Sequence, residues 1–330
     1  MNLGWRTSSP MPEAHLVSVG AKRASTVSVV VCTHSAARRE MLGNLIESIA
    51  AGSLRPVDLV IVVDRNRPLF EALEDASWPL PLRVIESPGS GLSAARNAGW
   101  QSVTSPLVAF IDDDAVASPG WLEELTEAVD QHAADVVGGA IEPRWTGEAP
   151  TWYSPLLGWV VGCSYEGLPV EPAKVRNVIG CNMLFRRDLL ERLGGFDTTL
   201  GRTNNGLAGC EETELCIRAN RAGANVVLIP GAQVAQILPP DRRRFRYAVR
   251  RGWDEGRSKR MLVALHGQVL ATEATYTRAL LRQTVRWVRT GILHRRAADI
   301  RHAGGLLAVL SSTTASYLLH GLRRTAHRAA

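Results

Sequence analysis

The chain has 330 residues, of which 45% are hydrophobic and 21% are charged, and it contains 29 glycines and 17 prolines. This composition excludes collagen-like and wholly disordered proteins, and the length predicts one large domain or one domain with an appendage. The five cysteines are odd in number and form no C-x-x-C pair. A disulfide framework or a zinc ribbon is therefore disfavoured, and a reducing compartment is expected.

The net charge of +6 is divided unevenly along the chain. Residues 1–240 contain 19 Lys and Arg against 27 Asp and Glu, a net charge of −8. Residues 241–330 contain 19 basic and 5 acidic residues, a net charge of +14. We find neither the apolar core of a secretory signal nor the ~20 apolar residues of a membrane span. The uneven charge predicts an acidic body and a basic tail with separate tasks. The protein is expected to be cytoplasmic.

Predicted elements follow a regular order after residues 1–25, which are polar, rich in turn-forming residues and expected to be a flexible segment. The expected strands are Val27–Thr33, Asp58–Asp64, Leu82–Glu86, Leu107–Ile111 and Val136–Ile141, and the expected helices are Arg38–Ala51, Gly91–Ser102 and Trp121–His132. This alternation is typical of an α/β fold in which helices flank both faces of a mostly parallel sheet.

The rest of the chain has a less regular pattern. Residues 143–172 are rich in aromatic residues, have no clear period and are expected to form a long loop. Later expected elements are the strand Val178–Arg186, the helices Asp188–Leu193 and Glu211–Ala222, and the strand Ala224–Ile229. The composition changes after Pro239-Pro240, so we place a boundary there and expect a basic helical extension over residues 241–330. One of its helices would carry a basic face beside an apolar stripe: Arg278, Arg282, Arg286 and Arg289 next to Leu281, Val285, Val288 and Ile292.

Acidic residues follow two of the expected buried strands. Asp64 ends one strand, and Asp112, Asp113 and Asp114 directly follow another. Ligands of such sheets bind beyond the carboxyl ends of the strands, so these residues can share one crevice. Side chains at positions i and i+2 point the same way, which would pair Asp112 with Asp114 around Mg²⁺ or Mn²⁺ and a substrate phosphate. The alternatives are a solvated acidic turn and, for Asp64, a helix cap.

Two helix starts offer further polar groups. The segment GLSAARN, residues 91–97, allows close backbone approach to an anion and brings Arg96 toward it, unless it is a tightly packed helix start with a surface arginine. Glu211 and Glu212 suit the dipole at the start of their helix, and a carboxylate aimed at the crevice could instead act as a general base. Neither a G-x-G-x-x-G segment nor a P-loop occurs, which disfavours those nucleotide sites.

Over residues 27–240 the chain resembles family 2 glycosyltransferases. The resemblance is carried by seven segments, taken in order: VSVVVCT, VIVVD, GLSAARN, FIDDD, GCNMLFRR, GGFD and CEETEL. The resemblance implies a GT-A domain over 26–240, with a nucleotide-sugar-binding part in 26–142 and an acceptor and catalytic part in 143–240. It implies inverting transfer of a sugar, of the hexosyltransferase type, from a nucleoside-diphosphate-sugar to a hydroxyl acceptor. That acceptor would be a glycan, a lipid-linked glycan or another envelope or secondary-metabolite compound, and Mg²⁺ or Mn²⁺ would assist.

Residue by residue, the resemblance implies a complete site. The donor-binding residues would be Thr33, Asp64, Arg96, Asp112 and Asp113, and the metal ligands would be Asp114 and Asp112. Glu212 would be the catalytic base, and Glu211 would orient it or contact the acceptor. Gly180, Cys181 and Asn182 would line the acceptor side, where Trp152 and Trp159 would stack on sugar faces unless the aromatic residues pack in the core.

Three positions depart from the family pattern. Glu212 stands where the family more often has Asp, and Arg65 stands where a second Asp often follows the first. Gln236 stands where the family often has a His that can help to bind the metal. Because a neutral amide is a poorer ligand, we expect weak metal affinity or a metal held by the diphosphate and Asp114 almost alone.

Other functions compete with sugar transfer. A nucleotidyltransferase would share the sheet, but it would usually have a Gly-rich basic segment after the first strand, and CTHSAARRE lacks the glycines. A non-catalytic GT-A-like binding protein with a docking tail is the second alternative. For the tail we expect an anionic membrane surface, which would place the protein peripherally at the inner face of the cell membrane. A helical lid on the body is the alternative, and the apolar stripes disfavour nucleic acid.

Overall fold

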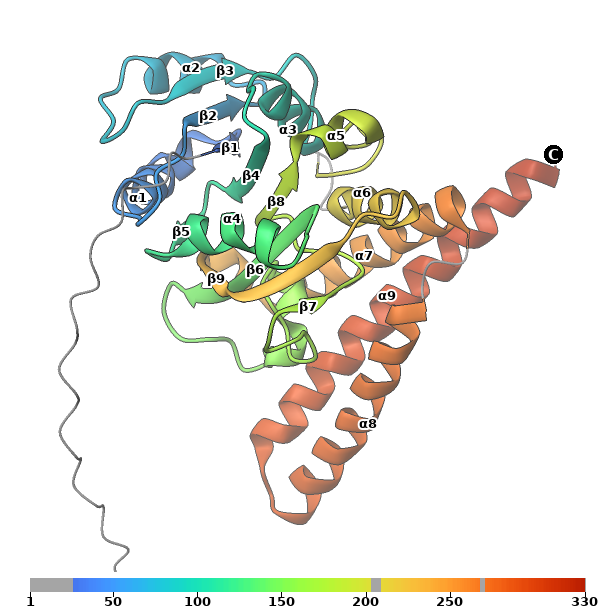
Figure 1. Cartoon of the computed structure of the whole chain (residues 1–330). Helices are drawn as coiled ribbons and strands as arrows, with labels where there is room; N and C mark the ends of the chain where they lie inside the picture. Colours follow the sequence, from blue (N-terminus) through green and yellow to red (C-terminus); the bar gives the residue numbers. More distant parts are fainter. Residues whose placement is uncertain (1–25, 203–208, 268–270, 330) are drawn as a thin grey trace, which may run out of the picture.

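The computed structural model describes residues 26–202, 209–267 and 271–329, so the segment 1–25, expected to be flexible, lies outside the described residues. The described chain forms one sheet with helices packed around it and a pair of long helices that extends from the body (Figure 1). The strand order is β3-β2-β1-β4-β8-β6-β9-β5, and β7 pairs with β9.

The strands are β1 Val27–Thr33, β2 Asp58–Val63, β3 Arg83–Glu86, β4 Leu107–Asp112, β5 Ala115–Ala117, β6 Val136–Trp145, β7 Ala173–Lys174, β8 Asn182–Arg186 and β9 Val226–Leu238. The α-helices are α1 Arg39–Ala50, α2 Arg67–Glu74, α3 Leu92–Gln101, α4 Trp121–Gln131, α5 Arg187–Leu193, α6 Glu211–Arg221, α7 Phe245–His266, α8 Ala271–Leu293 and α9 Ala297–Ala329. Short 3₁₀ helices are η1 Ala36–Arg38, η2 Pro155–Val161 and η3 Pro240–Arg243.

The first four strands are parallel, as the continuous apolar runs predict, and both of their faces are covered. Val29 and Val31 of β1 lie in one apolar core with Leu42 of α1, whereas Val30 lies in a second core with Trp100 of α3. A Cβ atom at Gly99 would lie 2.3 Å from Cγ1 of Val30, so the close approach of α3 to β1 requires glycine there.

The second half of the sheet is mixed. Strand β8 is antiparallel to both of its neighbours, β4 and β6, while β6 and β9 are parallel. The strand expected over Val178–Arg186 begins only at Asn182, and β9 continues to Leu238, well past the expected end at Ile229. The elements α2, β5, β7 and η2 are not among the expected ones; β5 and β7, with three and two residues, are too short to show a period.

The basic tail forms helices, as expected, and each of α7, α8 and α9 contributes residues to the core of the body. Ala248, Leu280, Leu306 and Val309 belong to the same apolar core as β1. Trp152 of the aromatic segment donates a hydrogen bond from Nε1 to the carbonyl oxygen of Arg243 at 2.9 Å. The division at Pro240 stays a prediction, although residues on its two sides share one core.

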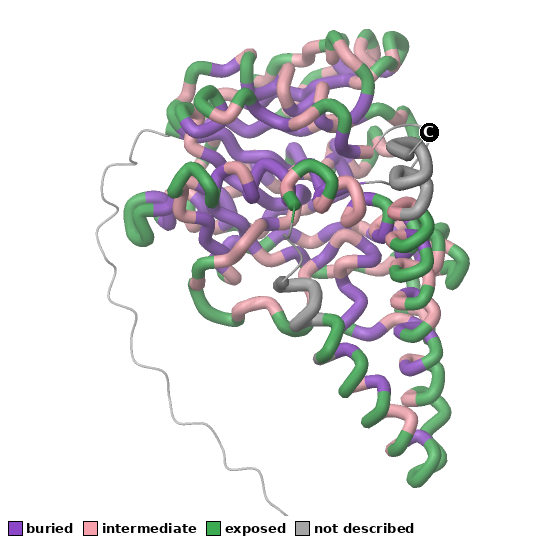
Figure 2. Tube along the Cα trace, turned by 90° about the vertical axis from the view of Figure 1, so that its right-hand side faces the viewer, coloured by how far each residue is buried: buried purple, intermediate pink, exposed green. Residues whose placement is uncertain are grey.

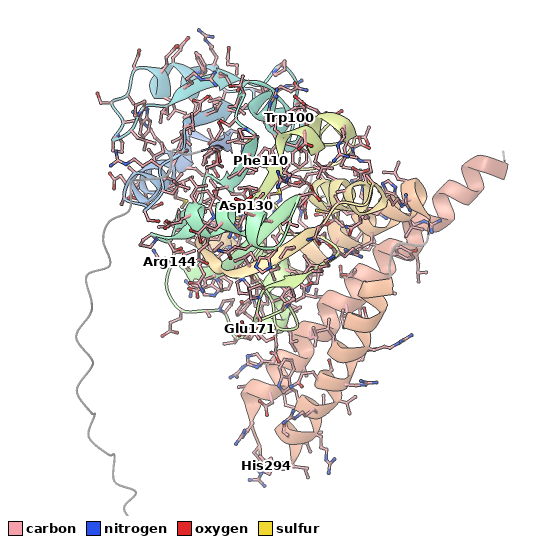
Figure 3. The ribbon with its side chains drawn as sticks, in the orientation of Figure 1. Trp100, Phe110, Asp130, Arg144, Glu171 and His294 are labelled. Carbon is pink, nitrogen blue, oxygen red and sulfur yellow. The ribbon has the colours of Figure 1, made fainter. Side chains whose placement is uncertain are left out.

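The helices α8 and α9 lie side by side as a hairpin that leaves the body, and the part far from the body is mostly exposed (Figures 1 and 2). Figure 3 shows His294 at the distant end of this hairpin. Among the described helices, none combines the length and the apolar character needed to cross a membrane.

If α9 completes the core, Leu306→Ala should lower the free energy of unfolding by about 2–5 kcal/mol, because the side chain is fully buried and a cavity would remain. Leu307 is the matched control, since it is 43% exposed and the same substitution removes little buried surface. Urea unfolding of both variants measures the difference. Equal stabilities would show that α9 contributes nothing to the core.

Candidate active site

A cavity of about 470 Å³ lies where the body meets the C-terminal helices. Its wall on the body side includes Arg96, Asp112, Trp159, Gly180, Cys181, Arg202, Glu211, Glu212 and Gln236. Its wall on the tail side includes Arg251, Glu255, Lys259, Leu280, Leu310 and Tyr317. Asp112 reaches this cavity because it ends β4, the strand that carries the buried Phe110 labelled in Figure 3. The cavity therefore lies at the carboxyl end of the parallel strands, as the sequence predicts.

Arg96 connects the polar residues of the cavity wall. Its guanidinium donates from Nη1 to Oε1 of Glu211 at 2.8 Å, and from Nη2 to the carbonyl oxygen of Gly180 at 2.8 Å and to Oδ1 of Asp112 at 3.3 Å. A Cβ atom at Gly180 would lie 2.9 Å from Nη2 of Arg96, so this contact requires a residue without a side chain. The predicted residues Arg96, Asp112, Gly180 and Glu211 are thus brought together, although Arg96 and Glu211 are 115 positions apart.

Glu212 follows Glu211 at the start of α6 and lines the cavity. Burial and the neighbouring charge of Glu211 raise the pKa of the Glu212 carboxyl to about 7, although Arg96 opposes the change. A carboxyl group with a pKa near neutrality can both accept and release a proton under physiological conditions. Within the described residues, Oε2 of Glu211 is buried and has no hydrogen-bond partner.

Thr33 and Asp113 form a buried pair beside the cavity. Thr33 donates from Oγ1 to Oδ2 of Asp113 at 2.7 Å, and Arg38 donates from Nη1 to Oδ1 at 2.6 Å. Burial raises the pKa of Asp113, and the Arg38 charge counteracts this. Neither Thr33 nor Asp113 is in the cavity wall.

Asp64 has one oxygen engaged and one free. Its Oδ2 accepts from the backbone N–H of Gly91 at 2.9 Å, which fastens the turn before α3 to the end of β2. Its Oδ1 is buried without a hydrogen-bond partner among the residues that the structure describes. A buried carboxylate oxygen without a donor is costly, so this atom is suited to accept from a ligand N–H group.

Asp114 is buried and is not in the cavity wall, whereas Asp112 is, so the structure does not present the two carboxylates together as the expected metal site requires. β4 ends at Asp112 and the chain turns at Asp113 and Asp114, so the alternation of side chains along a strand no longer applies. Asp114 is 1% exposed, whereas the side chain of Asp112 is 23% exposed. Over the described part of the chain, no group of three His, Cys, Asp or Glu side chains is placed to hold a metal ion. Both oxygens of Asp114 accept from nitrogen donors, one from Gln236 and the other from Arg242, so the arrangement does not fit a divalent cation there.

The acceptor-side residues divide into two groups. Gly180, Cys181 and Trp159 line the cavity, and Nε1 of Trp159 is buried with no partner among the described residues. Trp152 instead packs in the core, with its backbone close to Gly305 of α9. Asn182 is fully buried, accepts from Nε1 of Trp121 at 2.8 Å and joins neighbouring strands. Trp152 and Asn182 therefore do not lie where the sequence prediction puts them.

The sequence prediction misses an ionic group of α7 in the cavity wall. Arg251 lies 2.9 Å from one carboxylate oxygen of Glu255, and Lys259 lies 3.2 Å from the other. Burial works against the charged form, but Lys259 and Arg251 lower the pKa of Glu255 to about 2. The i, i+4 spacing of the three residues could have suggested this group, but not its place in the cavity.

Comparison with known proteins gives consistent matches. The family profile described as glycosyl transferase family 2 matches residues 28–194. A glucosyl-dolichyl phosphate glucuronosyltransferase of Haloferax volcanii is 34% identical over 259 residues, 77% of this chain and 83% of that protein. The succinoglycan biosynthesis protein ExoM of Rhizobium meliloti is 29% identical over 75% of this chain and 76% of its own length.

The fold has a solved counterpart in the mannosyltransferase PcManGT of Pyrobaculum calidifontis, in complex with GDP-Man and Mn²⁺. The TM-score is 0.60 at 16% identity, over 90% of this chain and 88% of that chain. This likeness confirms the predicted GT-A fold. The matched profile and the Haloferax relative together establish that the chain is a glycosyltransferase and belongs to family 2.

Proposed function

We propose that this glycosyltransferase moves a sugar from a nucleoside-diphosphate-sugar to a hydroxyl group, with inversion at the anomeric carbon. The observation that carries the proposal is the position of Glu212, a carboxyl with a pKa of about 7 in the same cavity as Arg96 and Asp112. A hydroxyl acceptor has a pKa far above 7, so a positioned carboxylate must take its proton during the attack. One base on the face opposite the leaving group gives inversion.

The donor would lie at the β1–β2–β4 end of the cavity. At the end of β2, outside the cavity wall, the free Oδ1 of Asp64 is suited to accept from a nucleobase N–H, and Thr33 with Asp113 would support the nucleoside from behind. The leaving diphosphate needs positive charge beside it, and Arg96 and Arg202 are in the cavity wall. The PcManGT structure contains Mn²⁺, but the surroundings of Asp114 in this chain do not fit a divalent cation, so the proposed transfer includes no metal.

The acceptor would lie between Trp159 and the C-terminal helices. Leu280, Leu310 and Tyr317 make that side of the cavity wall partly apolar. The name of the Haloferax relative describes a lipid-phosphate-linked sugar as its acceptor. We therefore favour a lipid-linked sugar as the acceptor of this chain.

The tail would bring the protein to the membrane that holds such an acceptor. On α8, Leu281, Val285 and Ile292 are 48%, 69% and 68% exposed, so the apolar stripe faces outward. Arg282, Arg286 and Arg289 are exposed on the same helix. An outward surface that is both basic and apolar matches an anionic bilayer, at about 1 kcal/mol per basic residue near the surface.

The base assignment predicts the behaviour of Glu212→Gln. Transfer, measured as nucleoside diphosphate release in a screen of nucleotide sugars, should fall by about 10²–10⁴-fold. Binding of the nucleoside diphosphate, measured by calorimetry, should not change, because the substitution keeps the shape of the side chain. Glu211→Gln is the comparison: if it abolishes transfer and Glu212→Gln does not, Glu211 is the base. A protein that releases no product from any donor would be a non-catalytic binding protein.

The pH dependence follows from the raised pKa of Glu212. The base is charged above its pKa, so kcat/KM should rise with pH through about 7 and then level off. Glu211→Gln removes the like charge that raises this pKa, so the rising limb should move to lower pH. Glu191→Gln, on α5, is the control and should leave the limb in place. If Glu211→Gln does not shift the rising part of the pH profile, the charge of Glu211 does not raise the pKa of Glu212.

The membrane proposal predicts that the full chain pellets with anionic vesicles at low salt and is released at high salt, because charge attraction is screened within about 8 Å at physiological ionic strength. Replacing Arg282, Arg286 and Arg289 by Gln should abolish pelleting. The matched control replaces the exposed body residues Arg55, Arg67 and Arg83 by Gln. Truncation at Pro240 is less informative, because it removes core residues as well. Equal pelleting of both triple variants would contradict a membrane role for α8.

A further inference from the structure

The carboxylate of Asp114 has both oxygens engaged by nitrogen donors. Gln236 donates from Nε2 to Oδ1 at 3.2 Å, and Arg242 donates from Nη2 to Oδ2 at 3.1 Å. Nη1 of Arg38 lies 3.5 Å from the same Oδ2. Two guanidinium groups and an amide therefore surround a carboxylate that is 1% exposed.

Arg242 is held in this position from several sides. It lies in η3, directly after β9, and its backbone N–H donates to the carbonyl oxygen of Pro239 at 3.0 Å. Its second terminal nitrogen, Nη1, donates to the carbonyl oxygen of Val161 at 3.0 Å. The residue is 5% exposed, so its charge needs the Asp114 carboxylate as a partner.

Gln236 closes the other side of Asp114. It is 1% exposed, and while its Nε2 donates to Asp114, its Oε1 lies 3.7 Å from Sγ of Cys163 as an acceptor. The amide thus presents its nitrogen, and not its oxygen, to Asp114. A divalent cation at Asp114 would meet two guanidinium groups and an amide N–H, all of them positively polarised.

The cavity itself supplies positive charge from side chains. Five basic residues, Arg96, Arg176, Arg202, Arg251 and Lys259, are in its wall against four acidic ones, Asp112, Glu211, Glu212 and Glu255. Arginine binds phosphate oxygens in a two-pronged geometry and stays charged at any physiological pH. The wall therefore carries a net charge of +1, and its arginines are the groups that would contact a diphosphate.

We propose that Arg242 takes the place of a divalent cation at Asp114, and that sugar transfer by this enzyme does not require a metal. Arg242 is a positioning residue: it neutralises Asp114 and blocks metal binding there. Arg202 in the cavity wall would contact the donor diphosphate, and the buried Arg96 adds positive charge to the same wall. The reaction in this inference, sugar transfer, rests on the proposed function. The absence of a metal requirement rests on the contacts of Asp114.

The first experiment uses the full chain, stripped of metal on a chelating resin. Nucleoside diphosphate release should be equal in EDTA and in Mn²⁺, and the Kd of UDP or GDP, whichever binds, should be equal in both. The electron paramagnetic resonance signal of free Mn²⁺ should not fall when the protein is added. A rate that falls by about tenfold or more in EDTA, about 1.4 kcal/mol in the barrier, and returns with Mn²⁺ would overturn the proposal.

The second experiment tests Arg242 itself. Arg242→Gln should uncover Asp114, so that Mn²⁺ binding appears in the resonance signal and transfer becomes dependent on Mn²⁺. Arg242→Lys keeps the positive charge and should remain independent of metal. Arg244→Gln, two positions along and exposed, is the matched control and should resemble the unmodified chain. Circular dichroism establishes that each variant is folded, and folded Arg242→Gln without Mn²⁺ binding would contradict the proposal.

The two proposals fail in different ways. If no donor releases product with or without Mn²⁺, the proposed function is wrong, and the Mn²⁺ and nucleotide binding measurements still decide the inference about Asp114. If release occurs and depends on Mn²⁺ in the unmodified chain, the proposed function stands and the inference about Arg242 is wrong.

Discussion

The buried guanidinium of Arg96 is the interaction on which the cavity depends. At 3% exposure its charge is stable only with partners, and it finds them in Glu211, Asp112 and the carbonyl oxygen of Gly180. These partners come from α6, from the end of β4 and from the segment before β8. Because removal of one partner would leave a buried charge unpaired, the three segments are held in one arrangement around the cavity.

The acid–base role that we propose for Glu212 follows from this arrangement. Arg96 lies close enough to oppose the rise in its pKa, but its contacts are made with Glu211, so the charged Glu211 remains beside Glu212. Burial and that like charge keep the pKa near neutrality, where a base is most effective at physiological pH. A neighbouring carboxylate thus tunes the proposed base, and the arginine keeps that carboxylate in place.

The C-terminal helices are joined to the cavity through buried contacts. Arg242 reaches Asp114 from η3, and the Arg251–Glu255–Lys259 group of α7 forms part of the cavity wall. On α8, Leu280 is buried against the body while the adjacent Leu281 is exposed. If α8 lies on a membrane as proposed, the same helices that touch the bilayer would also form the proposed acceptor end of the cavity. Attachment of the protein to the membrane and entry of the acceptor into the cavity would then depend on the same helices.

The sequence by itself determined the parallel strands β1, β2 and β4, the acids at their ends, the helix starts at Gly91 and Glu211, and the family. These features are local, since continuous apolar runs, glycines and caps act within a few residues. Only the tertiary structure decided what those acids face. The sequence prediction put Asp114 beside Asp112 because it treated the strand as continuing, whereas the strand ends at Asp112. The partner of Asp114, Arg242, is 128 positions away. Asn182 and Trp152 connect elements of the fold and do not line the cavity, because their hydrogen-bond partners lie on other elements. No periodicity along the chain specifies which distant side chains meet, because packing of the whole chain makes that choice.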